Sequence, residues 1–173
     1  ADFGQNLTGL VELRIQGEPG QKIRVRHAEL LDREGRFYPD TLRTARSHDN
    51  YILNGEPQTL MPHFTFHGFR YIAVDGILDP KPEMFTACVM HSDMPRTGSF
   101  SCSNELVNRL QENISWGMRD NFFDIPTDCP QRDERLGWMG DAQVFAKTAA
   151  FNRNTALFFR KWMRDVAAES SLE

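Results

Sequence analysis

The first half of the chain alternates apolar and polar residues in short runs, which is the pattern of strands with one buried face. Residues 11–16 alternate in this way, and residues 22–27 do so again after the Gly-Glu-Pro-Gly turn at residues 17–20. We expect these two runs to pair as a hairpin.

Further strands are expected at residues 51–53, 62–67, 69–74 and 83–91, because glycine, proline and Asp-Gly turns separate these short runs. Several short strands with regular turns indicate an antiparallel β-sandwich, which we assign to residues 1–95. His63 and His67 are interpreted as a satisfied pair on one strand face and not as metal ligands.

The period changes after residue 98, where apolar residues begin to recur at helical spacing. One helix is expected from residue 103 to about residue 118, with Ser101 or Ser103 as its N-cap. Residues 144–149 and residues 157–166 predict two more helices. We therefore expect mixed α and β structure in separate segments, with a helical segment at residues 96–173.

Three helices with many aromatic residues need more covering partners than the rest of this chain supplies. The chain also begins with Ala-Asp-Phe, without an initiator Met or a signal-peptide pattern. We therefore expect a piece of a larger protein that continues with more helices. In isolation it is expected to self-associate through exposed helix faces.

Composition excludes several classes of protein. The 173 residues are 40% hydrophobic and 25% charged, with a formal net charge of −4, which gives no electrostatic footprint for nucleic acid. No apolar run approaches the roughly 18–20 residues of a membrane span. The three cysteines lie far apart and show no metal-ligand spacing.

The stretch at residues 120–141 carries the candidate chemistry. It has no strand or helix period and reads as a long loop, and long loops inside compact domains are usually functional. Carboxylates can move protons, guanidinium groups can grip hydroxyls, and an indole can stack on a sugar ring. The stretch contains Asp120, Asp124, Asp128, Asp133, Glu134, Asp141, Arg132, Arg135 and Trp138.

A cluster of acids could instead bind Ca²⁺, but the spacing here does not match an EF-hand loop. We therefore expect neither a metal nor a cofactor.

The motif PTDCPQRDERLGWMGDAQ at residues 126–143 resembles the signature of bacterial α-L-rhamnosidases of glycoside hydrolase family 78. Upstream, DFGQNLTGLVELRIQGEPG, RHAELLD and FTFHGFRYIAV are similar to the β-sandwich module that precedes the catalytic domain in that family. The resemblance runs along essentially the whole chain.

This resemblance implies that residues 96–173 are the start of an (α/α)6 barrel and that the parent hydrolyses terminal α-L-rhamnosides with inversion. It implies that Glu134 is the general acid and that Asp128, Arg132, Trp138 and Asp141 bind the rhamnose. The partners would be rhamnose-containing oligosaccharides or glycosides. The general base of the family lies beyond this chain, so the isolated chain should be inactive.

Each of these side chains also has an alternative structural role. Glu134 could be paired with Arg132 or Arg135, and Arg132 could merely hold the loop. Asp128 could satisfy backbone amides in its own turn.

Trp138 could be an ordinary core residue, and Asp141 could be the N-cap or a first-turn residue of the next helix. Asp133 and Arg135 are assigned structural roles. The alternative function is a carbohydrate-binding or scaffolding sandwich at residues 1–95, without activity.

Overall fold

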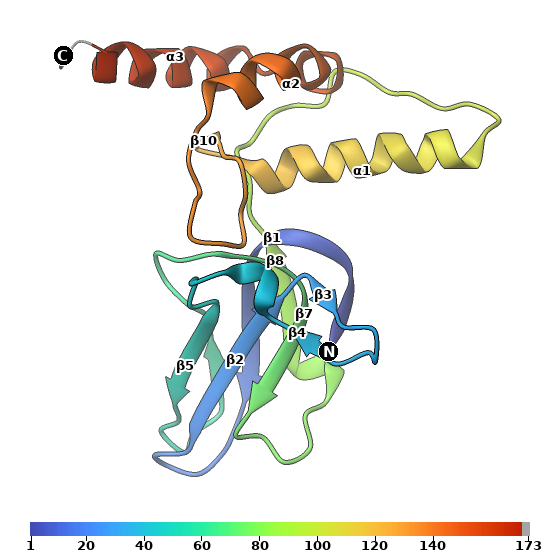
Figure 1. Ribbon diagram of the computed structural model, residues 1–173. Coiled ribbons are helices and arrows are strands. Elements are labelled where there is room, and N and C mark those ends of the chain that lie inside the picture. The colour runs from blue at the N-terminus through green and yellow to red at the C-terminus, as the bar shows by residue number, and fades with distance from the viewer. Residues whose placement is uncertain (171–173) are drawn as a thin grey trace. The chain divides into compact units, whose positions relative to one another are not determined.

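The computed structural model describes residues 1–170, which divide into two compact units. The sheet unit comprises Ala1–Met90 together with Cys129–Glu134. The helical unit comprises His91–Asp128 and the chain from Arg135 onward. The predicted helical segment extends to residue 173, and its last three positions lie outside the described residues. Figure 1 colours the elements of both units along the chain.

The sheet unit is built on one antiparallel sheet, in the order β5-β2-β7-β1-β6, with β8 paired to β1. Its strands are β1 (Asp2–Ile15), β2 (Lys22–Ala28), β5 (His48–Ile52), β6 (Gln58–Leu60), β7 (His67–Asp75) and β8 (Phe85–Val89). The smaller elements are β3 (Leu30–Leu31), β4 (Phe37–Tyr38) and the 3-10 helices η1 (Asp40–Leu42) and η2 (Pro82–Met84). The predicted order of an antiparallel β part followed by helices is confirmed.

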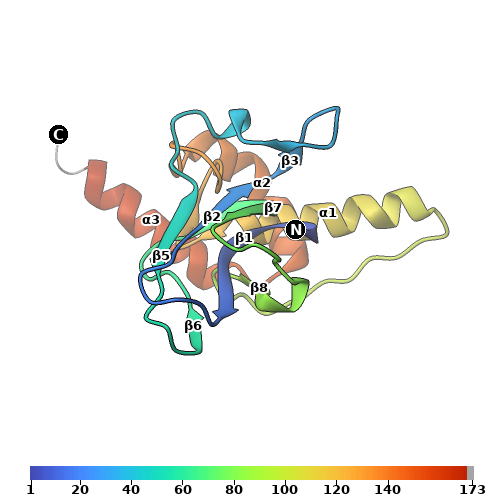
Figure 2. The same cartoon turned by 90° about the horizontal axis from the view of Figure 1, so that it is seen from below.

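Strand β1 is shared by two parts of this sheet. Its first half pairs with β7, with Leu7 opposite Phe69, whereas Leu13 lies opposite residues of both β6 and β8. A register shift interrupts the first half, and residues 7–11 are all buried. Figures 1 and 2 show β1 curving over one end of the sheet unit.

The predicted hairpin of residues 11–16 with residues 22–27 is wrong, because β7 lies between β1 and β2 in the sheet. Strand β2 pairs instead with β5 and β7. Alternation shows that each run has one face to bury, and it does not specify which strand lies at its edge.

The predicted strand at residues 62–67 is also wrong. Strand β6 ends at Leu60, and β7 begins only at His67. Between them Phe64 has a positive φ of 59° and a fully exposed side chain, a backbone state that breaks a strand. His63 therefore lies in a loop and forms no strand pair with His67. The strands expected around residues 51–53, 69–74 and 83–91 overlap β5, β7 and β8.

The helical unit contains the three predicted helices, α1 (Glu105–Asn121), α2 (Met139–Asn152) and α3 (Ala156–Ser170). Two short strands, β9 (Phe122–Phe123) and β10 (Ile125–Pro126), follow α1. The N-cap of α1 is Asn104, whose side-chain oxygen accepts from the amide of Leu106 at 2.9 Å. Neither Ser101 nor Ser103 is the cap, because asparagine is as good a cap as serine and stands where the helix begins.

The core of the helical unit joins all three helices through Phe122, which stacks on Phe158 at 4.6 Å. The buried members of this core are Met94, Met118, Phe122, Ala149 and Phe158. Many apolar side chains of the helices stay outside it: Leu106 is 81% exposed, and Val144 is 83% exposed. Within residues 1–170, none of the helices has the length and apolar character that crossing a membrane requires.

Candidate active site

Within the predicted loop, the side chains of Asp128 and Trp138 form a hydrogen bond, and both residues belong to the helical unit. The indole nitrogen of Trp138 donates to Oδ2 of Asp128 at 3.2 Å, and the amide of Leu136 donates to Oδ1 at 2.9 Å. The amide of Asp128 in turn donates to the carbonyl of Leu136 at 2.9 Å, and Thr127 pairs with Gly137. Asp128 therefore does satisfy a backbone amide, that of Leu136 on the other side of the loop.

The side chain of Trp138 is 50% exposed, so this residue does not form part of the core. Its hydrogen bond to Asp128 fixes the edge of the ring and leaves much of the ring surface accessible. An exposed, fixed indole beside a carboxylate is suited to stacking on a sugar ring.

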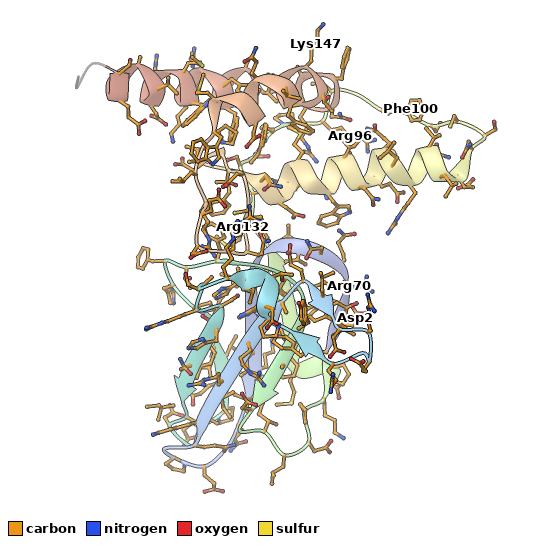
Figure 3. All side chains as sticks on the ribbon, viewed as in Figure 1. Asp2, Arg70, Arg96, Phe100, Arg132 and Lys147 are labelled. Carbon is orange, nitrogen blue, oxygen red and sulfur yellow. The ribbon has the colours of Figure 1, made fainter. Side chains whose placement is uncertain are left out.

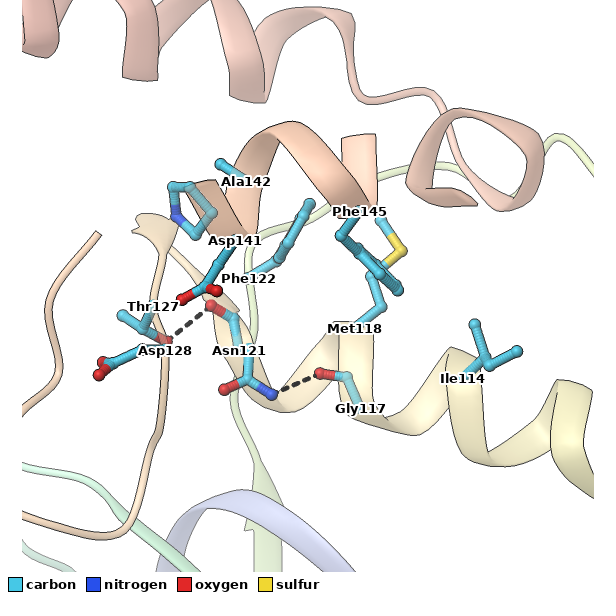
Figure 4. A pocket seen from close by; sticks show the side chains of 11 residues that line it. Ile114, Gly117, Met118, Asn121, Phe122, Thr127, Asp128, Asp141, Ala142 and Phe145 are labelled. Carbon is cyan, nitrogen blue, oxygen red and sulfur yellow. Dashed lines mark hydrogen bonds between the residues drawn. The ribbon is translucent and has the colours of Figure 1, made fainter. Parts of the chain in front are cut away.

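A pocket of about 380 Å³ brings Asp128 and Asp141 together in the helical unit (Figure 4). Asp141 stands in the first turn of α2, where a carboxylate interacts favourably with the positive end of the helix dipole. Trp138 occupies the N-cap position, so the first-turn role expected for Asp141 is confirmed and the N-cap role is wrong. The pocket is lined by Ile114, Gly117, Met118, Asn121, Phe122, Pro126, Thr127, Asp128, Asp141, Ala142 and Phe145.

Hydrogen bonds connect three residues that line this pocket, Gly117, Asn121 and Thr127. The hydroxyl and the amide of Thr127 both donate to the carbonyl of Asn121, at 2.7 and 2.8 Å. The side-chain amide of Asn121 donates to the carbonyl of Gly117 at 2.8 Å (Figure 4). The lining of the pocket combines two carboxylates with the aromatic rings of Phe122 and Phe145. Such a lining suits a ligand ring that has hydroxyl groups and one apolar face.

Arg132 and Glu134 lie in the sheet unit, because the segment Cys129–Glu134 packs on it. Gly68 of β7 permits a close approach: a Cβ there would lie 2.9 Å from Cβ of Gln131 and 3.0 Å from Cγ of Pro130. Cys129 and Gln131 are buried. The first half of the motif is therefore held by close packing against a strand.

Two guanidinium groups hold the carboxylate of Glu134. Nε of Arg132 and Nη1 of Arg43 each lie 3.0 Å from Oε2 of Glu134. The pairing with Arg132 is one of the alternatives expected from the sequence. Arg43 was not predicted, and a contact between positions 91 residues apart leaves no local signal in a single sequence.

The neighbouring acid, Asp133, is held from the same side. The hydroxyl of Thr44 donates to its carboxylate, and this hydrogen bond lowers the pKa of Asp133. The structural role expected for Asp133 fits this contact. Arg43 and Thr44 follow η1, so one loop of the sheet unit holds two consecutive carboxylates of the motif.

The sheet unit also groups the buried His27 and His67 with the half-buried Asp49, which sequence analysis did not identify. Nε2 of His67 lies 3.1 Å from Oδ1 of Asp49, and Nε2 of His27 lies 3.7 Å from Oδ2. The two rings stack at 4.0 Å with an interplanar angle of 15°. Parallel rings cannot both aim their in-plane lone pairs at one ion, so this geometry does not favour metal binding, although Nε2 of His27 and Oδ2 of Asp49 are buried without a hydrogen-bond partner among the described residues.

Burial lowers the pKa of His27 to about 3, and the neighbouring His67 adds to this effect. His27 is therefore neutral throughout the physiological range, in keeping with a structural role.

Two family models match this chain in sequence order. The model of the bacterial alpha-L-rhamnosidase concanavalin-like domain matches residues 1–91. The model of the bacterial alpha-L-rhamnosidase 6 hairpin glycosidase domain matches residues 95–172.

Individual relatives agree with the family models. An alpha-L-rhamnosidase of Streptomyces avermitilis is 47% identical over 167 residues, which are 95% of this chain and 16% of the relative. The crystal structure of the alpha-L-rhamnosidase of that organism in complex with L-rhamnose superposes with a TM-score of 0.94 at 46% identity, over 96% of this chain and 16% of the other.

A rhamnosidase structure from Dictyoglumus thermophilum gives a TM-score of 0.93 at 46% identity, over 96% of this chain and 19% of the other. The chain thus spans less than a fifth of the length of these relatives.

Proposed function

The chain belongs to the bacterial α-L-rhamnosidase family, and we propose that it is part of an enzyme that removes terminal α-L-rhamnose by inverting hydrolysis. The substrates would be rhamnose-containing oligosaccharides or glycosides. The observation that carries the proposal is the motif loop, which places two carboxylates on one pocket and holds a third between two arginines.

Glu134 is the general acid in this proposal and protonates the glycosidic oxygen as the bond to the rhamnose breaks. Its contacts with Arg43 and Arg132 both involve Oε2 and fix the orientation of the carboxyl group. Fixed orientation supports this role, because a proton donor must be held within hydrogen-bond reach of the leaving oxygen.

Asp128, Arg132, Trp138 and Asp141 bind the rhamnose. The carboxylates of Asp128 and Asp141 accept hydrogen bonds from sugar hydroxyls, and the guanidinium group of Arg132 donates hydrogen bonds to sugar hydroxyl oxygens. The exposed indole of Trp138 covers the apolar face of the ring. The hydrogen bond between Trp138 and Asp128 supports this assignment, because it couples the stacking surface to a hydroxyl-binding group.

Inversion also needs a general base that activates water on the opposite face of the sugar. In inverting glycosidases the two carboxyl groups stand about 6.5–9.5 Å apart, which leaves room for that water. We assign the base to a part of the parent protein outside this chain. The isolated chain then lacks half of the catalytic pair and should be inactive.

Residues 1–95 serve in this proposal as a scaffolding module for residues 96–173, the start of the helical catalytic domain. Arg43 and Thr44 support scaffolding over independent glycan binding, because they hold the two carboxylates Asp133 and Glu134. Arg43 is thus a positioning residue for the general acid.

We further propose that the isolated chain self-associates through the exposed apolar side chains of its helices. Val144 and Leu157, which are 83% and 70% exposed, carry this part of the proposal. Exposed apolar patches larger than a few hundred Å² commonly mark interaction surfaces.

The decisive experiment measures hydrolysis of an aryl α-L-rhamnoside by the longer parent protein. Replacing Glu134 by Gln should lower kcat about 10²–10⁴-fold on substrates whose leaving group needs protonation. The control is Glu56→Gln, the same chemical change at an exposed loop position. Undiminished turnover by Glu134→Gln would refute the acid assignment, and specific turnover by the 173-residue chain would refute its predicted inactivity.

A further inference from the structure

Three arginines line a second cavity in the helical unit, of about 640 Å³, which we call the arginine cavity. Arg96 lies on the segment that leads into α1 (Figure 3), Arg119 on the last turn of α1, and Arg153 just after α2. Arg96 and Arg153 are also paired as an isolated β-bridge. None of the three belongs to the pocket that contains Asp128 and Asp141.

These arginines lie outside the ion pairs of the described part of the chain. Within residues 1–170, none of the three forms an ion pair, and Arg119 donates no hydrogen bond. Nε of Arg119 is buried without a partner, and its guanidinium group lies over the ring of Trp116 at 4.9 Å. Burying an N–H donor without an acceptor costs free energy, because the donor loses its hydrogen bond to water. An acceptor that binds beside Nε of Arg119 would remove this cost.

The other two arginines are only partly engaged. Nε of Arg96 donates to the carbonyl of Gly98 at 2.8 Å, and Nη1 of Arg153 donates to the carbonyl of Met94 at 2.7 Å. Each guanidinium group carries five N–H donors, so most of the donors remain for a ligand. The two bonds hold both side chains in place before any ligand arrives, which reduces the entropy lost on binding.

The charge around the cavity remains positive. Burial lowers the pKa of Arg153, and repulsion from Arg119 and Arg96 adds to this effect, against which only Asp93 acts. Glu112 also lines the cavity, but it is already paired with Arg109 outside the cavity at 3.1 Å.

Glu105, in the first turn of α1, is the other acidic lining residue. Within residues 1–170 Glu105 forms no ion pair, so Glu105 and the nearby Asp93 are the acidic groups that stand against three guanidinium groups.

The side-chain amides that line the cavity already form hydrogen bonds within the protein. The side chain of Asn108 both donates to and accepts from the backbone of Cys102, at 2.8 and 2.9 Å. The amide of Gln111 donates to the side chain of Asn152, which donates to the carbonyl of Thr148. The charged donors left for a ligand are thus the guanidinium N–H groups, beside the hydroxyls of Ser101 and Ser115. The planar fork of a guanidinium group matches the paired oxygens of an oxyanion.

We propose that the arginine cavity binds a small oxyanion, meaning a sulfate, phosphate or carboxylate group, between Arg96, Arg119 and Arg153. This site is separate from the proposed sugar pocket, and the inference does not rest on the proposed catalytic function.

The test titrates the 173-residue chain with sodium sulfate, phosphate or acetate, and with chloride at matched ionic strength. The signals are the Nε–Hε resonances of the arginines in NMR spectra and the heat of binding. We expect saturable shifts in Arg119 with sulfate or phosphate and none with chloride. A saturable response to acetate as well would identify carboxylates as further ligands of the same site.

The variants are Arg119→Gln and Arg153→Gln, either of which should weaken binding about tenfold or more, since hydrogen bonds to charged groups are strong. Arg164→Gln is the control, because it removes the same charge from an exposed position on α3 outside the cavity. Circular dichroism confirms that each variant folds. The second cavity variant keeps the test decisive if the first one does not fold.

Equal responses to sulfate and chloride would overturn the proposal, as would equal weakening by Arg164→Gln and Arg119→Gln. The same titration is repeated on the longer parent protein. Loss of binding there would mean that polypeptide fills the cavity, and the proposal of a free oxyanion ligand would fail.

Discussion

Replacing Gly68 by alanine should displace the segment that carries Glu134. The new Cβ would lie 2.9 Å from Cβ of Gln131 and 3.0 Å from both the amide nitrogen of Gln131 and Cγ of Pro130. Ordinary contact begins at 3.4 Å, and one of these neighbours is backbone. The segment must therefore move by several tenths of an ångström, and Glu134 lies only three residues beyond Gln131.

The expected loss of stability follows from two opposing terms. Overpacking a close contact costs about 1–3 kcal/mol. Alanine also restricts the unfolded chain relative to glycine, which contributes about 0.4–1 kcal/mol of stability. We therefore expect Gly68→Ala to lower the free energy of unfolding by about 1–2 kcal/mol.

The effect on catalysis should be larger than the effect on stability suggests. A misplacement of about 1 Å can cost about 100-fold in rate, so a shift of roughly half that size predicts about a tenfold lower kcat for the proposed hydrolysis by the parent protein. KM should change less, because Arg132 is the one proposed rhamnose-binding residue on the displaced segment, whereas Asp128, Trp138 and Asp141 lie outside it.

Urea denaturation of the chain and steady-state kinetics of the parent measure these two effects. Gly117→Ala in α1 is the control for the urea measurement only, because a Cβ there meets nothing within 4 Å but the residue lines the proposed sugar pocket. It should stabilise the protein by up to about 1 kcal/mol through helix propensity. The reasoning is refuted if Gly68→Ala is as stable and as active as the wild type.

Three further predictions concern single contacts or surfaces. Arg43→Ala should lower kcat of the parent about two- to fivefold, a modest effect because this arginine is 57% exposed and its pairing with Glu134 is screened by water; an unchanged kcat would argue against positioning by Arg43. The hydrogen bond from Arg70 lowers the pKa of Asp2 from 3.8 to about 2 (Figure 3). The unfolded state therefore binds the proton first as the pH falls, so the stability from this pair is present above pH 3.8 and is lost as the pH approaches about 2. Arg70→Gln should flatten stability over that interval in acid denaturation, and an unchanged slope would contradict this. The isolated chain should sediment as oligomers in analytical ultracentrifugation, with Val144→Gln shifting it toward monomer, and a monomeric wild type at high concentration would contradict self-association.

The sequence alone determined the class and order of the main elements. Strand β2 and the three helices overlap the segments that the period of apolar residues predicts, and β5, β7 and β8 overlap the short runs between turn residues. The prediction of these elements succeeds because a strand or helix must present one apolar face, and the spacing of apolar residues within the segment itself shows that face. The motif at residues 126–143 indicated the family in the same local way.

Local signals failed where competing residues were equivalent or the backbone departed from regular geometry. Ser101, Ser103 and Asn104 are all good caps, and only the position of the first helical turn selects Asn104. The apolar run around Phe64 has strand composition, but a left-handed residue interrupts it.

Only the tertiary structure decided which surfaces meet. An apolar face on residues 11–16 can be buried against many partners, and β7, not β2, lies beside β1. The contact of Arg43 with Glu134 and the shared cavity of Arg96, Arg119 and Arg153 join positions far apart in sequence. A residue pattern records what each segment must bury or pair, whereas the choice of partner depends on the packing of the entire chain, which no single segment encodes.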